Sequence, residues 1–186
     1  TEVQSFAHYN GGNDQLFGQE ERDLLMGGAA RDTIWGDEGA LIGVSVGSDD
    51  IIFGDHGKAV FYDQSWDLES VETWDETDGD DDLIYANEGA DVVLAGFGRD
   101  SVYGESGSDI IVGDFGSADF RQDGSLYDLR VDVTNEGDAD EIQGDDGEDT
   151  IFGAFGDDLL SGNEGHDTIF GDFGWMTLTL DGVTRQ

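Results

Sequence analysis

The sequence predicts an all-β fold: a parallel β-roll, which is a solenoid of nine-residue repeats, interrupted by β-hairpin excursions. Three observations support this prediction. Glycine, aspartate and aliphatic residues recur with a period of nine along most of the chain. Short segments of alternating apolar and polar residues separate the groups of repeats. No segment shows the periodicity of an amphipathic helix.

The period of nine is clearest between Gly144 and Phe170, where the same pattern occurs three times in succession. If the glycines are numbered positions 1 and 4, aspartate occupies position 6 and a branched aliphatic residue occupies position 8. The position 6 column consists of Asp14, Asp23, Asp32, Asp50, Asp82, Asp91, Asp100, Asp109, Asp140, Asp149, Asp158 and Asp167. The step from Asp32 to Asp50 is twice the period, so we expect one degenerate turn between them, with Leu41 in place of aspartate.

Each nine-residue unit is expected to combine a turn of six residues with a strand of three. Glycine permits the positive φ angles and close backbone approaches that such a turn needs. Side chains alternate along a strand, so position 8 points inward while positions 7 and 9 point outward. One unit cannot bury its aliphatic residue alone, so the units must stack and position 8 forms the predicted core.

Each group of repeats closes with a Gly-Asp-x-Gly turn, at Gly54, Gly113 and Gly171, and an alternating segment follows. Asp123-Gly124 and Asp181-Gly182 are typical of tight hairpin turns. The predicted organisation is a return strand of a preceding hairpin at 1–8, roll blocks at 9–57, 77–116 and 135–174, hairpins at 58–76 and 117–134, and the first strand and turn of a further hairpin at 175–186.

The chain is strongly acidic, with 45 Asp and Glu against 7 Lys and Arg and a formal net charge of −38. Such a charge opposes compaction, yet 37% of the residues are hydrophobic, which is too many for a solvated acidic tail. Multivalent cations would reconcile the two facts. Nucleic acid and anionic membranes would be repelled, so neither nucleic-acid binding nor membrane insertion is expected. Cysteine is absent, which excludes a disulfide framework.

The nonapeptide resembles the RTX (repeats-in-toxin) motif, Gly-Gly-x-Gly-x-Asp-x-U-x, a calcium-binding β-roll repeat. The resemblance implies that two nonapeptides form one coil and that Ca²⁺ lies between alternate turns, held by position 6 carboxylates and turn carbonyls. It therefore implies that the twelve aspartates of that column are calcium ligands. It also implies a secreted or cell-surface location, as modules of a larger repetitive protein.

Carried over residue by residue, the resemblance implies about six well-formed sites and weaker sites at the block edges. The implied pairs are Asp14 with Asp32, Asp32 with Asp50, Asp82 with Asp100, Asp91 with Asp109, Asp140 with Asp158 and Asp149 with Asp167. Asp23 would face Leu41, so its site should be weak or empty. Ala59, Ala118 and Met176 stand at position 6 of the closing turns, which weakens the sites expected there.

No catalytic function is expected. Gly43-Val-Ser45-Val-Gly47 matches a nucleophile elbow, but that motif needs a following helix and partner residues that this sequence lacks. Two function classes remain open. The first is a calcium-dependent spacer or assembly unit of a secreted or surface protein or filament. The alternative is a calcium-dependent adhesive or carbohydrate-binding module attached to an adhesin or a secreted enzyme.

Two surface features bear on this choice. The outward aromatic residues at position 9 are Phe17, Trp35, Phe53, Tyr85, Tyr103, Phe152 and Phe170, which either lie under the hairpins or neighbouring modules or form an intermolecular surface. The segment Thr1–Phe6 resembles a return strand, and joining Gln186 to Thr1 would reproduce the spacing of the internal hairpins. Head-to-tail self-association through the terminal strands is therefore expected.

Overall fold

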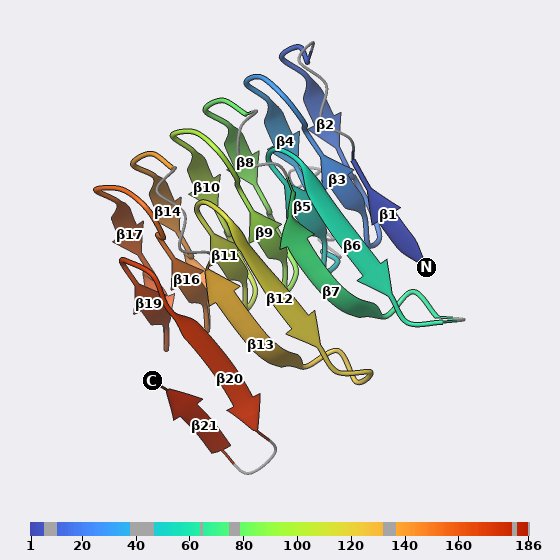
Figure 1. Cartoon of the computed structure of the whole chain (residues 1–186), viewed down its shortest axis with the longest axis vertical. Helices are drawn as coiled ribbons and strands as arrows, with labels where there is room; N and C mark the ends of the chain where they lie inside the picture. The colour runs from blue at the N-terminus through green and yellow to red at the C-terminus, as the bar shows by residue number, and fades with distance from the viewer. Residues whose placement is uncertain are drawn as a thin grey trace.

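The computed structural model describes residues 1–5, 11–37, 47–63, 65–74, 79–131, 137–179 and 182–185, with the main chain alone for 179 and 182–185. These parts of the chain contain β-strands and no helix, which confirms the predicted all-β fold. It follows that no helix among them is long and apolar enough to cross a membrane. The strands form three stacked layers (Figure 1).

Two of the layers are parallel six-stranded sheets that together form the roll. The outer roll sheet contains, in spatial order, β17 (Leu159–Ser161), β14 (Glu141–Gln143), β10 (Ser101–Tyr103), β8 (Leu83–Tyr85), β4 (Thr33–Trp35) and β2 (Gln15–Phe17). The middle roll sheet contains β19 (Thr168–Phe170), β16 (Thr150–Phe152), β11 (Ile110–Val112), β9 (Val92–Leu94), β5 (Ile51–Phe53) and β3 (Leu24–Met26). The chain enters the two sheets alternately, so two successive strands make one coil.

The third layer, the hairpin sheet, is antiparallel and has seven strands. They are β1 (Glu2–Gln4), β6 (Gly57–Phe61), β7 (Leu68–Thr73), β12 (Gly116–Phe120), β13 (Leu126–Val131), β20 (Trp175–Thr179) and β21 (Gly182–Arg185). They neighbour one another in chain order. Two short strands, β15 (Asp146–Gly147) and β18 (Glu164–Gly165), pair in the turns of the roll.

The three layers enclose two hydrophobic cores. Between the roll sheets lie the position 8 side chains, including Ile34, Ile84, Ile111 and Ile151, all fully buried. This agrees with the predicted role of position 8. The second core lies between the middle roll sheet and the hairpin sheet, where outward residues such as Phe53 pack against the hairpins. The hairpins therefore cover one outward face of the roll.

The hairpins are inserted within turns of the roll and do not separate independent blocks. After β5 the chain passes Gly54 and Asp55, forms the β6–β7 hairpin, and re-enters at Gly79 to reach Asp82 and β8. Strand β5 nevertheless pairs directly with β9, and β4 pairs with β8. The six-residue turn is thus split between its positions 2 and 3, and the roll continues in register beneath the insertion.

The predicted degenerate turn around Leu41 is wrong. A full extra turn would return the chain to the sheet that it left, so β4 and β5 would share a sheet. Instead β4 lies in the outer roll sheet and β5 in the middle one, where it pairs with β3. The chain therefore crosses only once between the sheets from β4 to β5, and the described residues contribute twelve strands to the two roll sheets. Leu41, Gly43, Ser45 and His8 lie outside the described residues.

The two ends of the chain contribute the edge strands of the hairpin sheet. Strand β1 pairs antiparallel with β6, in the same way that β7 pairs with β12 and β13 with β20. At the other edge, β21 pairs antiparallel with β20 from Met176↔Arg185 to Thr179↔Gly182. The described residues of this segment thus form two paired strands, of which the sequence predicts only the first.

Candidate metal centres

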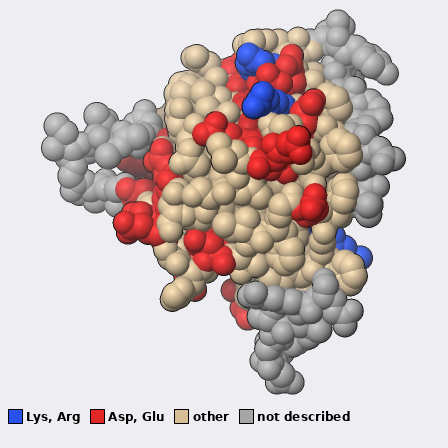
Figure 2. All heavy atoms as spheres, turned by 90° about the vertical axis from the view of Figure 1, so that its left-hand side faces the viewer, with Lys and Arg blue, Asp and Glu red and all other residues tan. Residues whose placement is uncertain are grey.

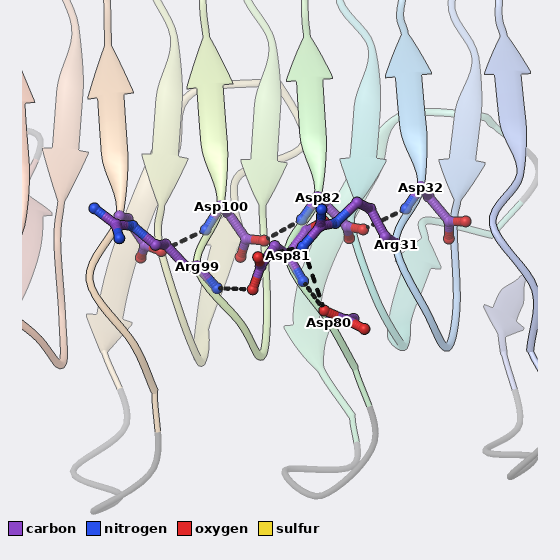
Figure 3. A network of polar contacts seen from close by, with 8 residues as sticks. Arg31, Asp32, Asp80, Asp81, Asp82, Arg99 and Asp100 are labelled. Carbon is purple, nitrogen blue, oxygen red and sulfur yellow. Dashed lines mark hydrogen bonds and ion pairs between the residues drawn. The ribbon is translucent and has the colours of Figure 1, made fainter.

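The twelve position 6 aspartates form two rows, one along the turns that enter each roll sheet. Asp14, Asp32, Asp82, Asp100, Asp140 and Asp158 precede the outer sheet, and Asp23, Asp50, Asp91, Asp109, Asp149 and Asp167 precede the middle sheet. Within a row, each backbone N–H donates to the Oδ1 of the next aspartate, with N···O distances from 2.7 Å for Asp32 and Asp82 to 3.2 Å for Asp149 and Asp167. Figure 3 shows part of the first row.

Ten adjacent aspartate pairs result, five in each row. Five of the pairs implied by the resemblance are adjacent in this way. The implied pair of Asp32 with Asp50 is wrong, because these residues belong to different rows: Asp32 bonds to Asp82, and Asp50 accepts from Asp23. Asp23 therefore faces a carboxylate and not Leu41. The rows also continue across the hairpins, through Asp100 with Asp140 and Asp109 with Asp149.

The second carboxylate oxygen has no partner in ten of these twelve residues. The Oδ2 atoms of Asp23, Asp32, Asp50, Asp82, Asp91, Asp100, Asp109, Asp140, Asp149 and Asp158 are buried and accept no hydrogen bond. Buried polar atoms are nearly always paired, because leaving them unpaired costs about 1–3 kcal/mol each. A regular series of exceptions therefore points to a missing binding partner.

Glycine at position 1 keeps the space beside each free oxygen clear of side-chain atoms. A Cβ on Gly27 would lie 2.4 Å from the Oδ2 of Asp32 and 2.3 Å from the carbonyl oxygen of Gly54. A Cβ on Gly54 would likewise lie 2.5 Å from the Oδ2 of Asp82. Ala86 and Ala95 are exceptions that carry a methyl group at this position. Carboxylate and carbonyl oxygens that face one another with no donor between them form an arrangement that suits a cation.

Electrostatics also favour a cation along the rows. Burial, followed by the neighbouring charge of Asp100, raises the pKa of Asp82 to about 9, and burial raises the pKa of Asp140 to about 10. Ionising such a row costs free energy unless a positive charge enters it. The bases do not supply that charge within the described residues: Arg22 and Arg31 pair with Asp49, Asp80 and Asp81 at the surface. On the face in Figure 2, Lys and Arg are few among many Asp and Glu.

The donor set suits calcium, which takes six to eight oxygen ligands, among them carboxylates and backbone carbonyls. In the described parts of the chain, no three His, Cys, Asp or Glu side chains gather closely enough to hold a metal by themselves. Each site must therefore combine row carboxylates with backbone carbonyls of the turns, as the resemblance implies.

A further group of buried carboxylates lies outside the position 6 column and is not among the predicted ligands: Asp37, Asp55 and Asp114. Each stands at position 2 of a turn that an insertion splits. Asp55 is 3% exposed and Asp114 is 1% exposed, and in each the Oδ1 atom has no partner. The signal that could have found them is the Gly-Asp dipeptide that recurs where each insertion begins.

Comparison with known families matches the chain to the RTX calcium-binding nonapeptide repeat, in four copies at residues 8–40, 76–102, 85–117 and 143–174. No curated protein and no solved structure matches the chain. The matched copies together span more than half of the sequence and include ten of the twelve row aspartates, all except Asp50 and Asp140. The chain therefore belongs to the RTX calcium-binding nonapeptide repeat family.

Proposed function

We propose that this chain is a calcium-dependent structural module, which folds on binding Ca²⁺ and acts as a spacer or assembly unit of a secreted or cell-surface protein. The observation that carries the proposal is the double row of aspartates, ten of which have a buried carboxylate oxygen with no hydrogen-bond partner. The position 6 aspartates are the proposed ligands. The functional groups repeat along the roll and do not converge on one cleft, which favours a structural role over a catalytic one.

The continuous rows raise the number of sites that we expect. Pairing within separate blocks gave about six, whereas the structure contains ten adjacent aspartate pairs. Ten divalent ions would cancel about half of the formal charge of −38. Since the ions bind the folded state, each adds to stability, by about 2.7 kcal/mol at a hundredfold excess over the dissociation constant.

Removal of calcium tests the proposal. In a chelator such as EGTA, the β signal in circular dichroism should be lost and the radius of gyration should increase, and both should recover when calcium is restored. Magnesium at the same concentration is the control, because its preference for a small octahedral site makes it a poor substitute. A spectrum and radius that do not change in EGTA would show that folding does not need calcium.

One observation bears on the alternative of carbohydrate binding. Phe17, Trp35, Tyr85 and Tyr103 form a continuous ladder on the outer roll sheet, which the hairpins do not cover. The rings stack on one another, with Phe17 and Trp35 4.5 Å apart and nearly parallel. The faces between neighbouring rings are therefore occupied, and the outer face of Phe17 at the end of the ladder and the ring edges remain for a partner. A sugar ring packs against an aromatic face, so the geometry favours the structural role.

A glycan array with the calcium-loaded chain separates the two functions. We expect no glycan to bind, and we expect Trp35→Ala to lower stability because the stacking is lost, by about 1 kcal/mol beyond the lost area. Saturable binding of a glycan that Trp35→Ala abolishes would favour the carbohydrate-binding module instead.

A further inference from the structure

The three split turns differ from the other turns of the roll at position 2. In the eight unsplit turns that the structure describes in full, the residue at this position has a positive φ: Gln19, Gly28, Asn87, Gly96, Glu105, Asp145, Ala154 and Asn163. In the split turns the residue is Asp37, Asp55 or Asp114, and none of them has a positive φ. The left-handed conformation is unfavourable for most side chains, so its absence marks a different local geometry.

In this geometry the side chains of Asp55 and Asp114 turn into the roll and reach the next turn on the same side. Asp55 Oδ2 accepts the backbone N–H of Phe97 at 2.6 Å, and Asp114 Oδ2 accepts that of Phe155 at 2.7 Å. Phe97 and Phe155 both occupy position 3 of the following turn. Asp37 Oδ2 instead accepts the backbone N–H of Ser48 at 3.4 Å, within its own turn. The split turns of Asp55 and Asp114 thus share one arrangement.

The other oxygen of Asp55 and of Asp114 is buried and has no partner. The strongest charge repulsion on Asp55 comes from the row carboxylates Asp82, of its own turn, and Asp100, of the next turn. A glycine stands where the chain re-enters the roll, and a Cβ there would meet the carboxylate: 2.1 Å from Asp55 Oδ2 for Gly79, and 2.2 Å from Asp114 Oδ1 for Gly137.

A buried carboxylate with a free oxygen beside two other carboxylates needs a positive charge nearby, because burial in a medium of low polarity penalises an unpaired ion. No Lys or Arg in the described parts of the chain forms an ion pair with Asp55 or Asp114. The ligand types at hand are carboxylate and carbonyl oxygens, which suit a hard divalent cation.

We propose that Asp55 and Asp114 are calcium ligands in their own right, and that calcium bound there ties the stem of each inserted hairpin to the next coil of the roll. The inference rests on the proposed calcium-dependent function. Since no three acidic side chains of the described chain gather round one point, each ion is shared with one row aspartate and completed by backbone carbonyls. Asp37 occupies the equivalent position in the first split turn.

The test compares Asp55→Asn and Asp114→Asn with Asp145→Asn, all in the full chain. Asparagine keeps the shape and the acceptor for the Phe97 or Phe155 N–H but removes the charge. Asp145 is a matched control, since it also occupies position 2 but lies in an unsplit turn with a φ of 67°. Bound calcium is counted by elemental analysis and its affinity is measured by calorimetry. Hydrogen exchange follows the β6–β7 and β12–β13 amides.

We expect Asp55→Asn and Asp114→Asn each to lose one bound ion or to bind it at least about tenfold more weakly. The hairpin next to the substitution should also lose calcium-induced protection, β6–β7 in the first case and β12–β13 in the second. Asp145→Asn should match the parent in all three measurements. Anomalous scattering from terbium-soaked crystals of the parent provides a test without a variant, with a peak expected beside the Oδ1 of Asp55.

The inference would be overturned if Asp55→Asn and Asp114→Asn both bound as many calcium ions as the parent, with the same affinity and the same protection of the hairpin amides from hydrogen exchange. A terbium-loaded crystal with no peak at Asp55 would also overturn it. Asp100→Asn distinguishes a failure of this inference from a failure of the proposed function. It should lose calcium from the row whether or not Asp55 and Asp114 bind calcium. A parent chain that binds no calcium would overturn the proposed function as well.

Discussion

At the scale of single residues, a buried row aspartate such as Asp100 combines two opposed properties. One oxygen accepts the backbone N–H of Asp82, which fixes the carboxylate in place, and the other has no partner. Without a cation, burial raises the pKa values of these groups, to about 9 for both Asp82 and Asp91. The same carboxylates can therefore be neutralised by protons or by calcium, and the two compete.

This competition predicts how pH acts on the calcium-free chain. An unfolded aspartate titrates near 3.8, whereas folded Asp82 and Asp91 titrate near 9. Between these values the folded state holds more protons than the unfolded state, so the stability of the calcium-free fold falls as pH rises through the window. After calcium is stripped on a chelating resin, circular dichroism should show more β structure at pH 5 than at pH 8. Less structure at pH 5 would contradict this.

Calcium binding depends on pH in the opposite direction from the stability of the calcium-free fold, because protons must leave the carboxylates before the ion can bind. Calcium affinity should therefore fall as the pH is lowered from 8 to 5. Calorimetric titrations at the two pH values in buffers of different ionisation enthalpy would also measure the protons released. Binding that is equally tight at both pH values, with no proton release, would not fit carboxylates of raised pKa.

The position of an aspartate in its row should decide the effect of removing it. Asp100 is 1% exposed, accepts the N–H of Asp82 and lies between two neighbours in its row, whereas Asp14 is exposed at the end of the same row. In calcium, Asp100→Ala should lower the free energy of unfolding by about 2 kcal/mol or more, since a buried N–H also loses its acceptor. Asp14→Ala should have a much smaller effect. Urea denaturation measures both, and equal losses would argue against the row.

Some residues could be predicted from the sequence and others could not. The columns at positions 6 and 8 recur with a fixed spacing, so their shared roles follow from periodicity alone. Asp55 and Asp114 stand outside the position 6 column, and the Gly-Asp dipeptide that marks them also occurs at Asp145 in an unsplit turn, so the sequence pattern alone does not show that they are buried. Their burial depends on the split of the turn, which brings them against the following coil, and that contact is not local in the sequence.

At the scale of elements, the hairpins behave as insertions that leave the roll unchanged beneath them. Gly54 and Asp55 supply positions 1 and 2 of one turn, and residues 79–82 supply positions 3 to 6. A chain without residues 56–78 therefore regains an unsplit turn with the ordinary spacing between β5 and β8. The hairpins contribute the cover of the second core, where Phe53 and Leu94 are buried.

Deletion of residues 56–78 should consequently preserve the roll. We expect the shortened chain to keep its calcium-dependent β signal, to bind the dye ANS through the uncovered middle roll sheet, and to unfold at lower temperature. Deletion of 56–77, which leaves one extra residue in the turn, is the control and should be less stable than the exact excision. A shortened chain that no longer folds in calcium would show that the hairpin is part of the folding unit.

The split turns also explain why the sequence misled at the level of elements. The hairpins add lengths that are not multiples of nine, so periodicity cannot show whether the register resumes after them. Between Asp32 and Asp50 the added length happens to equal one repeat, and the insertion therefore resembles a degenerate turn. Only the pairing of β5 with β3 and β9 shows that the chain crosses once between the sheets.

At the scale of the whole molecule, the terminal strands set the conditions for self-association. Strands β1 and β21 are the two edges of the hairpin sheet, and in an antiparallel sheet of seven strands they run in the same direction. The roll sheets have six strands each, with β17 and β19 at one end and β2 and β3 at the other. At one of these ends Leu159 is 65% exposed and Ile169 43% exposed.

Removal of residues 1–6 should therefore favour end-to-end association in calcium. Without β1 the hairpin sheet would have six strands, the same number as each roll sheet, and all three layers could continue into a second copy. Light scattering over a range of concentrations should show larger species for the shortened chain than for the parent. The same comparison in EGTA is the control. A shortened chain that stays monomeric at high concentration in calcium would count against the continuation of the three layers from one copy to the next.

The seven-to-six ratio of strands has a consequence for any array built from this chain. Stacked copies would gain one surplus strand at every junction, so the hairpin layer and the roll would advance by different lengths for each copy added. Growth could continue only if the β21 already in place displaced the β1 of the incoming copy from its pairing with β6. Every junction would then require a strand exchange, which is slow to form and slow to reverse. The displaced β1 segment would be exposed to solvent beside each completed junction.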